Sequence, residues 1–174
     1  LTEDEIQALS TISLDNPNFA LARDLFLFGC WTGISFTDIK NLTTDNIVEM
    51  NGASWIVSKR QKTGVPFQIK LMDIPMQIIR RYEPFRRDKR LDMVNKRIKA
   101  VAKKCGIEKP VSFHLSRHSF AVLALNYGMP IESVSKILGH TNITTTQIYA
   151  KVTNAKLEND ISAFESKISG RFVL

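Results

Sequence analysis

Apolar residues recur at helical spacing along most of the chain. Ile6, Leu9 and Ile12 form one stripe behind Thr2-Glu3-Asp4-Glu5, a start typical of a capped helix. A much denser apolar run over residues 19–31 predicts a helix that is buried on most sides. Further helices are predicted over residues 35–42, 77–82, 95–104, 114–127, 130–138, 142–151 and 157–168. The pattern therefore predicts a mainly helical chain.

One region favours strands instead. Residues 47–50 precede Asn51-Gly52, a dipeptide that favours a tight hairpin turn, and residues 55–59 form the predicted returning strand. Thr63-Gly64 predicts a second turn, followed by a third strand over 67–71. The predicted fold class is mainly α with a small three-stranded antiparallel β-sheet.

Composition narrows the class of partner. A chain of 174 residues with 44% hydrophobic residues fits one domain with a substantial core and excludes a disordered chain. Lys and Arg outnumber Asp and Glu by 24 to 17, and this basic excess favours a polyanion such as nucleic acid. Cys30 and Cys105 are expected to be reduced thiols in the cytoplasm. No apolar run approaches the length of a membrane span, so no membrane partner is expected.

The last third of the chain concentrates residues suited to phosphate chemistry. It carries His114-Leu-Ser-Arg117, Leu138-Gly139-His140 and Tyr149, with no acidic residue between Ser133 and Lys156. Arginine presents a planar fork of donors to phosphate oxygens, and histidine can donate a hydrogen bond near neutral pH. A tyrosine hydroxyl can act as a nucleophile and hold phosphorus covalently.

These motifs follow one another in the order and spacing of a known family. His114-x-x-Arg117, Leu138-Gly139-His140 and Tyr149 resemble box II of the tyrosine recombinases, the lambda-integrase type. Residues 32–39, Thr-Gly-Ile-Ser-Phe-Thr-Asp-Ile, resemble box I, and Lys62 occupies the place of the family's β-hairpin lysine. The resemblance implies the DNA breaking-rejoining fold. It also implies that residues 1–174 are a catalytic domain whose N-terminal DNA-binding domain or domains lie outside this fragment.

The resemblance implies a mechanism without metal, ATP or any other cofactor. Tyr149 is expected to attack the scissile phosphate, which forms a 3′-phosphotyrosyl bond and releases a 5′-hydroxyl. Arg117 would clamp the non-bridging oxygens, and His114 and His140 would donate hydrogen bonds to the same phosphate. Lys62 would protonate the leaving 5′-oxygen as general acid.

Box I departs from the family pattern at one position. The family carries an arginine after the Thr-Gly-aliphatic triplet, where this chain has Ser35, while Asp38 matches an acidic position that supports the site. Three interpretations of this difference are open. Another residue compensates for the missing arginine, the domain is weak or inactive alone, or the fragment is an altered version of a family protein. Compensation by Arg60 is the favoured hypothesis, because residues 60 and 62 would face the same side of an extended strand. Loss of one such donor costs about 3 kcal/mol in the transition state.

Several of these residues have structural alternatives. His114 and His118 lie four residues apart, a spacing that zinc enzymes also use, but no glutamate follows His114, so no metal site is predicted. His118 is expected to point into the core or to support the site. His140 could instead cap the preceding helix. Tyr82 and Tyr127 lack motif neighbours and are predicted to be packing residues.

The favoured function is site-specific DNA recombination or integration by an enzyme of a phage or mobile element, encoded by a bacterium or a phage. The alternatives are a nicking-closing enzyme like the type IB topoisomerases and a DNA-binding module with weakened catalysis. Double-stranded DNA is the expected partner, with a homotetramer on DNA and a monomer for the isolated fragment. The apolar tail over 157–174 is expected to pack on a neighbouring protomer or on its own domain.

Overall fold

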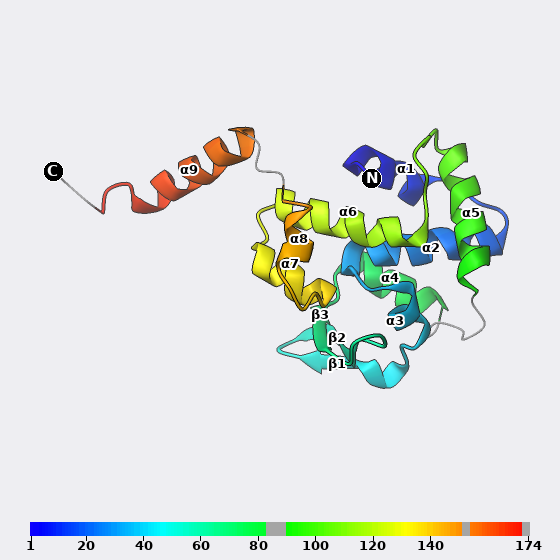
Figure 1. The fold of residues 1–174 in the computed structure, drawn as a ribbon. Helices are drawn as coiled ribbons and strands as arrows, with labels where there is room; N and C mark the ends of the chain where they lie inside the picture. Colours follow the sequence, from blue (N-terminus) through cyan, green and yellow to red (C-terminus); the bar gives the residue numbers. More distant parts are fainter. Residues whose placement is uncertain (83–89, 151–153, 172–174) are drawn as a thin grey trace.

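The computed structural model describes residues 1–82, 90–150 and 154–171. A bundle of helices surrounds α2 (Pro17–Thr32), which packs against four other helices (Figure 1). These partners are α1 (Glu3–Thr11), α4 (Asp73–Tyr82), α5 (Leu91–Lys104) and α6 (Phe113–Asn126). The dense apolar run predicted as a buried helix is therefore the centre of the bundle.

Local sequence signals account for where these helices begin. Thr2 and Glu5 form the capping box of α1, because the Thr2 hydroxyl accepts from the Glu5 amide and the Glu5 carboxylate accepts from the Thr2 amide. Asn16 caps α2 through the Asn18 amide. Helices α4 and α5 begin at Asp73 and Leu91 rather than at residues 77 and 95. The first turn of α4 contains Pro75, which a first helical turn tolerates, and the first turn of α5 is exposed over residues 91–93.

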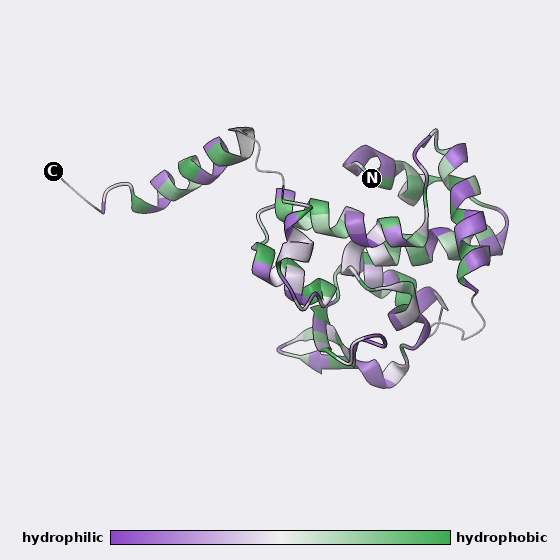
Figure 2. Cartoon of the chain, in the orientation of Figure 1, coloured by the Kyte–Doolittle hydropathy of each residue, from purple (hydrophilic) through white to green (hydrophobic). Residues whose placement is uncertain are grey.

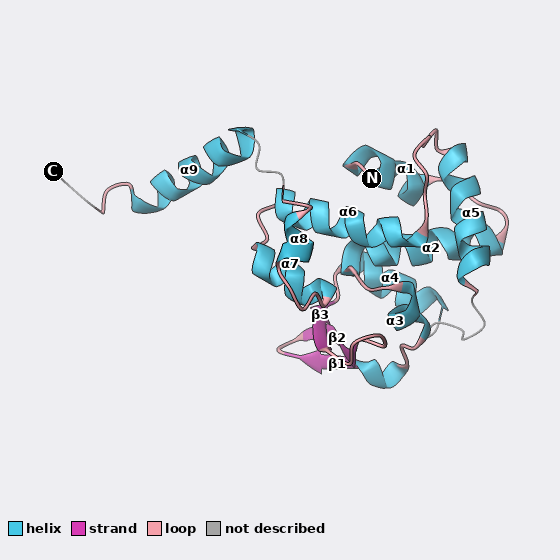
Figure 3. Ribbon diagram, in the orientation of Figure 1, coloured by secondary structure: helices cyan, strands magenta, loops and turns pink. Residues whose placement is uncertain are grey.

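The small sheet lies at one end of the bundle (Figure 3). Strands β1 (Ile47–Met50), β2 (Ala53–Lys59) and β3 (Pro66–Lys70) are antiparallel in the order β1-β2-β3, as predicted. Asn51 and Gly52 both have positive φ angles, 52° and 71°, as the predicted tight hairpin requires. The short helix α3 (Phe36–Lys40) and the 3₁₀ turn η1 (Thr44–Asn46) connect α2 to the sheet.

The turn between β2 and β3 overturns one sequence-based premise. Strand β2 ends at Lys59, and a turn follows in which the Arg60 amide donates to Val65 and the Gly64 amide donates to Arg60. Residues 60 and 62 therefore do not share one face of a strand. Arg60 is 5% exposed and turns into the protein, whereas Lys62 is exposed at the tip of the turn.

The C-terminal third contains α7 (Ile131–Leu138), α8 (Thr144–Gln147) and α9 (Asn154–Ile168). The helix predicted over 142–151 was wrong in length, and residue 151 lies outside the described residues. Beyond Gln147 the amides of Tyr149 and Ala150 bond to carbonyls three residues back, which is the tighter 3₁₀ pattern. The run of three threonines also has low helix propensity.

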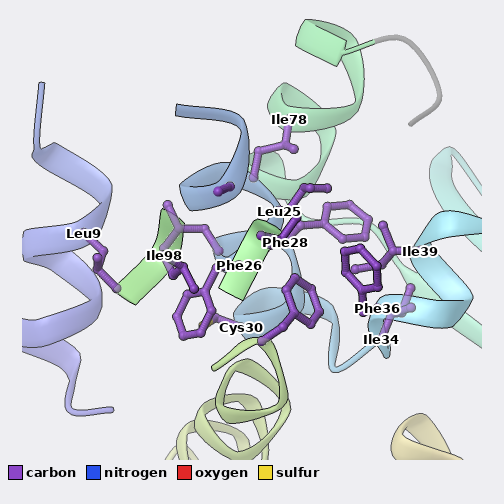
Figure 4. Close-up of a cluster of buried hydrophobic side chains, with 14 of the residues drawn as sticks. Leu9, Leu25, Phe26, Phe28, Cys30, Ile34, Phe36, Ile39, Ile78 and Ile98 are labelled. Atoms are coloured by element: carbon purple, nitrogen blue, oxygen red, sulfur yellow. The ribbon is translucent and has the colours of Figure 1, made fainter. Parts of the chain in front are cut away.

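Two apolar clusters form the core. The larger one contains residues from each of the helices α1 through α6 and from β2 and β3. Its central residues, including Phe26, Phe28 and Ile98, are shown in Figure 4. The smaller one joins α6 and α7 through Phe120, Leu125, Val134 and Leu138, and Tyr149 packs against it at its edge. Among the described residues, no helix combines the length and apolar character needed to cross a bilayer.

Helix α9 lies apart from the bundle (Figure 1). Hydrophobic and hydrophilic residues alternate along it (Figure 2), and Leu157, Ile161 and Phe164 are exposed. Their spacing of four and three residues places them on one face of the helix. The alternative in which this segment packs on its own domain is therefore not the arrangement seen for these residues.

Candidate active site

Three helices bring the predicted box II residues together. Helix α6 carries His114, Arg117 and His118, the C-terminal end of α7 carries His140, and the chain after α8 carries Tyr149. Helix α7 contacts both α6 and α8. The start of α6 is tied to α5, because the Phe113 amide donates to the Asn95 side chain at 2.7 Å. These contacts bring separate segments together.

Arg117 joins box I to box II. Its guanidinium donates to the Gly33 carbonyl and to the Leu138 carbonyl, the latter at 2.8 Å. Burial, reinforced by the nearby Arg60 charge, lowers the pKa of Arg117 to about 10. Arg117 is therefore still a cation at neutral pH, and its remaining N–H groups can bind an anion.

A line of aromatic rings leads to the tyrosine. The rings of His114 and His118 meet edge to face with centroids 4.5 Å apart, and those of His118 and Tyr149 with centroids 5.1 Å apart. His114 is exposed, while His118 and Tyr149 are half-buried. His118 thus contacts the ring of Tyr149, and of its two predicted placements, core or support of the site, this contact favours the second.

The electrostatic surroundings of Tyr149 favour a protonated phenol before reaction. Burial raises the pKa of Tyr149, and the positive charge of Arg117 offsets only part of this effect. In turn, the Tyr149 side chain acts to raise the pKa of Arg117. Attack by the phenolic oxygen therefore requires removal of its proton, and the adjacent cation favours the resulting oxyanion.

His140 is held by a residue that the motifs did not indicate. Its Nδ1 lies 2.8 Å from the hydroxyl oxygen of Thr146, a buried residue of α8. Burial and the charges of Arg117 and Arg60 lower the pKa of His140. This shift favours the neutral form of the His140 ring. Its backbone amide bonds to the Ser135 carbonyl at the end of α7, so it also takes part in ending that helix.

The half-buried Ser35 and the buried Asp38 form a polar unit at the start of α3. The Ser35 hydroxyl accepts from the Asp38 amide at 3.2 Å and donates to the Asp38 carboxylate at 2.8 Å. The same carboxylate accepts from the Gln61 amide at 2.9 Å and from the Arg60 guanidinium at 2.8 Å. Burial alone would raise the pKa of Asp38, but these donors hold it below its ordinary value. Asp38 is therefore an anion that organises Arg60.

Arg60 brings a second guanidinium close to Arg117. Besides Asp38, it donates to the Ile137 carbonyl of α7, and its guanidinium carbon lies 3.9 Å from the centre of the Phe67 ring. Its Nε has no hydrogen-bond partner among the described residues. The sequence-based hypothesis placed an arginine here to replace the one missing from box I. The structure brings Arg60 to the site by a turn instead of by a strand.

Lys62 is the predicted site residue that stands apart. It is exposed in the turn between β2 and β3, two residues beyond the buried Arg60. Its position at a turn tip leaves the long side chain in solvent in the DNA-free protein. A role for it therefore requires DNA to approach this turn.

Gly139 is expected to be intolerant of a side chain for two separable reasons. The first is its φ angle of +68°, which L side chains rarely adopt. The second is crowding, because a Cβ would lie 2.7 Å from Arg60 Nε, and the Arg60 guanidinium is already held by Asp38 and Ile137. Gly139→Ala should lower the free energy of unfolding by about 2–4 kcal/mol, measured by urea denaturation. Gly128→Ala is the control, because φ is +82° there but a Cβ meets nothing within 4 Å. Equal losses in the two variants would contradict the proposed crowding of Arg60.

Comparison with known proteins places this architecture. A sequence model of the phage integrase family matches residues 1–156. The chain belongs to the phage integrase family. This family member is 30% identical over 177 residues to the tyrosine recombinase XerA of Pyrococcus horikoshii, in an alignment covering 92% of the chain and 59% of XerA. It is 44% identical over 70 residues to the tyrosine recombinase XerD of Listeria monocytogenes, covering 40% of the chain and 24% of XerD.

A solved structure shares the fold of this integrase-family chain. The XerH site-specific recombinase, in a pre-cleavage complex with its difH substrate, superimposes with a TM-score of 0.73 at 18% identity. That match covers 95% of this chain and 54% of XerH. The chain thus spans less than two thirds of the length of each of these three relatives. The mainly helical fold with its three-stranded sheet is that of the tyrosine recombinase catalytic domain.

Proposed function

We propose that residues 1–174 are the catalytic domain of a site-specific tyrosine recombinase that cuts and rejoins DNA through Tyr149. The observation that carries this proposal is the place of Arg117, which hydrogen-bonds Gly33 and Leu138 and lies near enough to Tyr149, His140 and Arg60 for their charges to interact, although these residues come from distant segments. Such a cluster of cations and hydrogen-bond donors suits a phosphodiester, because negative charge develops on the phosphate oxygens in the transition state. Membership of the phage integrase family supports the same conclusion.

The reaction exchanges one phosphodiester for another. The Tyr149 oxygen attacks phosphorus, the bond from phosphorus to the 5′-oxygen breaks, and a 3′-phosphotyrosyl ester and a 5′-hydroxyl result. A 5′-hydroxyl from a second strand then attacks this ester, which restores the phosphodiester and returns the proton to Tyr149. Bond energy is conserved, so the chemistry needs neither ATP nor a cofactor.

Each site residue has a part in stabilising the pentavalent phosphorane. Arg117 binds the non-bridging oxygens with the N–H groups that are not engaged by carbonyls. His140 and His114 donate further hydrogen bonds, and His118 orients Tyr149 through their ring contact. Lys62 protonates the leaving 5′-oxygen when DNA lies over the turn.

Arg60 supplies the charge that the family draws from box I. Its guanidinium is positioned by Asp38, which is itself held by Ser35. Arg60 is too deeply buried to reach far into solvent, so it acts chiefly through its charge beside Arg117. This arrangement favours the compensated interpretation of Ser35 over a disabled site.

The proposed partner is double-stranded DNA, and the proposed assembly on DNA is a homotetramer. XerH, which shares the fold, was solved bound to its difH substrate. Recombination cuts two duplexes twice each, so four copies of Tyr149 are needed. The exposed apolar face of α9 supports packing of this helix on a neighbouring protomer, whereas the isolated chain is proposed to be monomeric. Two free thiols, Cys30 and Cys105, support a cytoplasmic location in a bacterium, with the gene carried by the bacterium or by a phage.

Covalent capture of DNA tests the proposed function. Nicked duplexes with randomised cores are incubated with the chain, and DNA that survives denaturation in SDS is sequenced to define one suicide substrate. We expect an adduct whose phosphopeptide maps to Tyr149 and a free 5′-hydroxyl on the released strand. Binding without any adduct would instead identify a DNA-binding module. Supercoil relaxation without strand exchange between duplexes would indicate an activity like that of the type IB topoisomerases.

Restoring the family residue in box I should not improve this enzyme. Ser35→Arg removes the N-cap of α3 and adds a third guanidinium beside Arg60 and Arg117, so cleavage of the suicide substrate should stay level or fall. The free energy of unfolding should drop by about 1 kcal/mol from loss of the cap alone. Ser35→Ala separates loss of the cap from the added charge. A large gain in cleavage rate for Ser35→Arg would show that the serine is a true deficit.

A further inference from the structure

Thr146 has a placement that the proposed recombinase chemistry does not yet use. It is the buried member of the run Thr144-Thr145-Thr146, with 0% exposure, while the two preceding threonines are exposed. Its amide donates to Ile143 at 2.8 Å and its carbonyl accepts from Tyr149 at 3.0 Å. The backbone of Thr146 is therefore fixed on both sides, three residues before the proposed nucleophile Tyr149.

The hydroxyl of this residue meets a ring nitrogen. A buried threonine in a helix ordinarily bonds its hydroxyl to a carbonyl three or four residues back. Here the hydroxyl oxygen lies 2.8 Å from Nδ1 of His140, at the end of α7. A buried hydroxyl that lost this partner would be left unpaired, so the contact links the two segments that carry His140 and Tyr149.

The direction of this hydrogen bond decides what His140 can offer a phosphate. A neutral imidazole carries one N–H, and the other nitrogen is an acceptor. If the Thr146 hydroxyl donates to Nδ1, the proton resides on Nε2, which can then donate to an anionic oxygen. If Nδ1 donates to Thr146 instead, Nε2 presents a lone pair and repels the same oxygen. The neighbouring charges of Arg117 and Arg60 disfavour a ring protonated on both nitrogens.

We propose that Thr146 is a positioning residue that donates to Nδ1 of His140 and so holds this ring in the Nε2–H tautomer, ready to donate to the scissile phosphate. This inference rests on the proposed recombinase function for its catalytic consequence. The tautomer itself is a property of the free protein. Because the Tyr149 amide bonds to the Thr146 carbonyl, the same contact also fixes the position of Tyr149 relative to His140.

Nitrogen-15 NMR of the histidine rings tests the tautomer without DNA. His140 is assigned by its absence in His140→Gln, and its Nδ1 and Nε2 shifts report which nitrogen bears the proton. We expect the Nε2–H form in the wild type and in Thr146→Ser, and a mixture of both tautomers in Thr146→Val, which keeps the shape but not the hydroxyl. An Nδ1–H form in the wild type, or no change in Thr146→Val, would overturn the proposal.

Cleavage of the suicide substrate then tests the consequence. Thr146→Val should cleave about tenfold to a hundredfold more slowly at saturating DNA, as expected for one lost hydrogen bond to a charged group, and Thr146→Ser should restore the rate. Unchanged cleavage in Thr146→Val would show that the tautomer is irrelevant and refute the positioning role. A wild-type chain that forms no adduct would count against the recombinase function alone, since the NMR arm decides the tautomer independently.

Discussion

Replacing Tyr149 with phenylalanine is expected to abolish the covalent protein–DNA adduct while leaving DNA binding and stability nearly unchanged. The phenylalanine ring fills the same space beside His118, so the ring contact is kept, but the attacking oxygen is gone. The loss should be at least about ten-thousandfold, as for other residues that form the covalent intermediate. Denaturing gels of the suicide substrate measure the adduct, and gel shifts of an intact duplex measure binding.

Tyr127 provides the matched control for this variant. The expectation that Tyr127 is a packing residue was wrong, because its side chain is 75% exposed and its hydroxyl donates to Glu3 on the surface. Tyr127→Phe removes an equivalent oxygen outside the candidate site, and this variant should cleave like the wild type. An adduct that persists in Tyr149→Phe, or that disappears in Tyr127→Phe, would contradict the assignment of the nucleophile.

Arg60→Ala is expected to impair both stability and chemistry. The change leaves the Asp38 carboxylate buried without its cation, which should lower the free energy of unfolding by about 3–5 kcal/mol in urea titrations. At a temperature where the variant is folded, cleavage should fall about a hundredfold to a thousandfold, since one preorganised positive charge beside Arg117 is lost. Arg60→Lys keeps the charge without the fork and should lie between these limits.

Lys62→Ala separates the two basic residues of the turn. Lys62 is exposed, so its loss should leave stability unchanged, although the proposed general acid is removed. A substrate with sulfur in place of the leaving 5′-oxygen needs no proton donor, because a thiolate leaves readily. This substrate should rescue Lys62→Ala and should not rescue Arg60→Ala. Wild-type cleavage by Arg60→Ala, together with abolished cleavage by Lys62→Ala, would refute the compensating role of Arg60.

Local signals in the sequence predicted most of the fold. The capping box at Thr2 and Glu5, the apolar run of α2 and the Asn51-Gly52 hairpin each depend on neighbours in the chain, and all three predictions were confirmed. The helix over 142–151 was predicted too long, because the 3₁₀ turns after Gln147 leave no mark in the spacing of apolar residues. Helical spacing alone does not reveal where such tightening begins.

The sequence likewise predicted some residues of the candidate site and missed others. Motif spacing indicated Arg117, His140 and Tyr149, whose meeting in space follows from the packing of α6, α7 and α8. The inward turn of Arg60 could not be deduced correctly, because it depends on where β2 ends and on a carbonyl of α7 that is distant in the sequence. Thr146 gave no signal, since a threonine before a helix end has many ordinary uses.

The pairing of Arg60 with Asp38 bears on how distant relatives are judged functional. Here a cation stands at the corner between the sheet and α3, although the segment that supplies it is far along the chain from box I. A screen that demands an arginine directly after the Thr-Gly-aliphatic triplet would discard this chain as degenerate. A screen that asks whether some basic side chain can reach the box I carboxylate would keep it. Such a screen would separate relatives that have lost the cation from relatives that supply it from another segment.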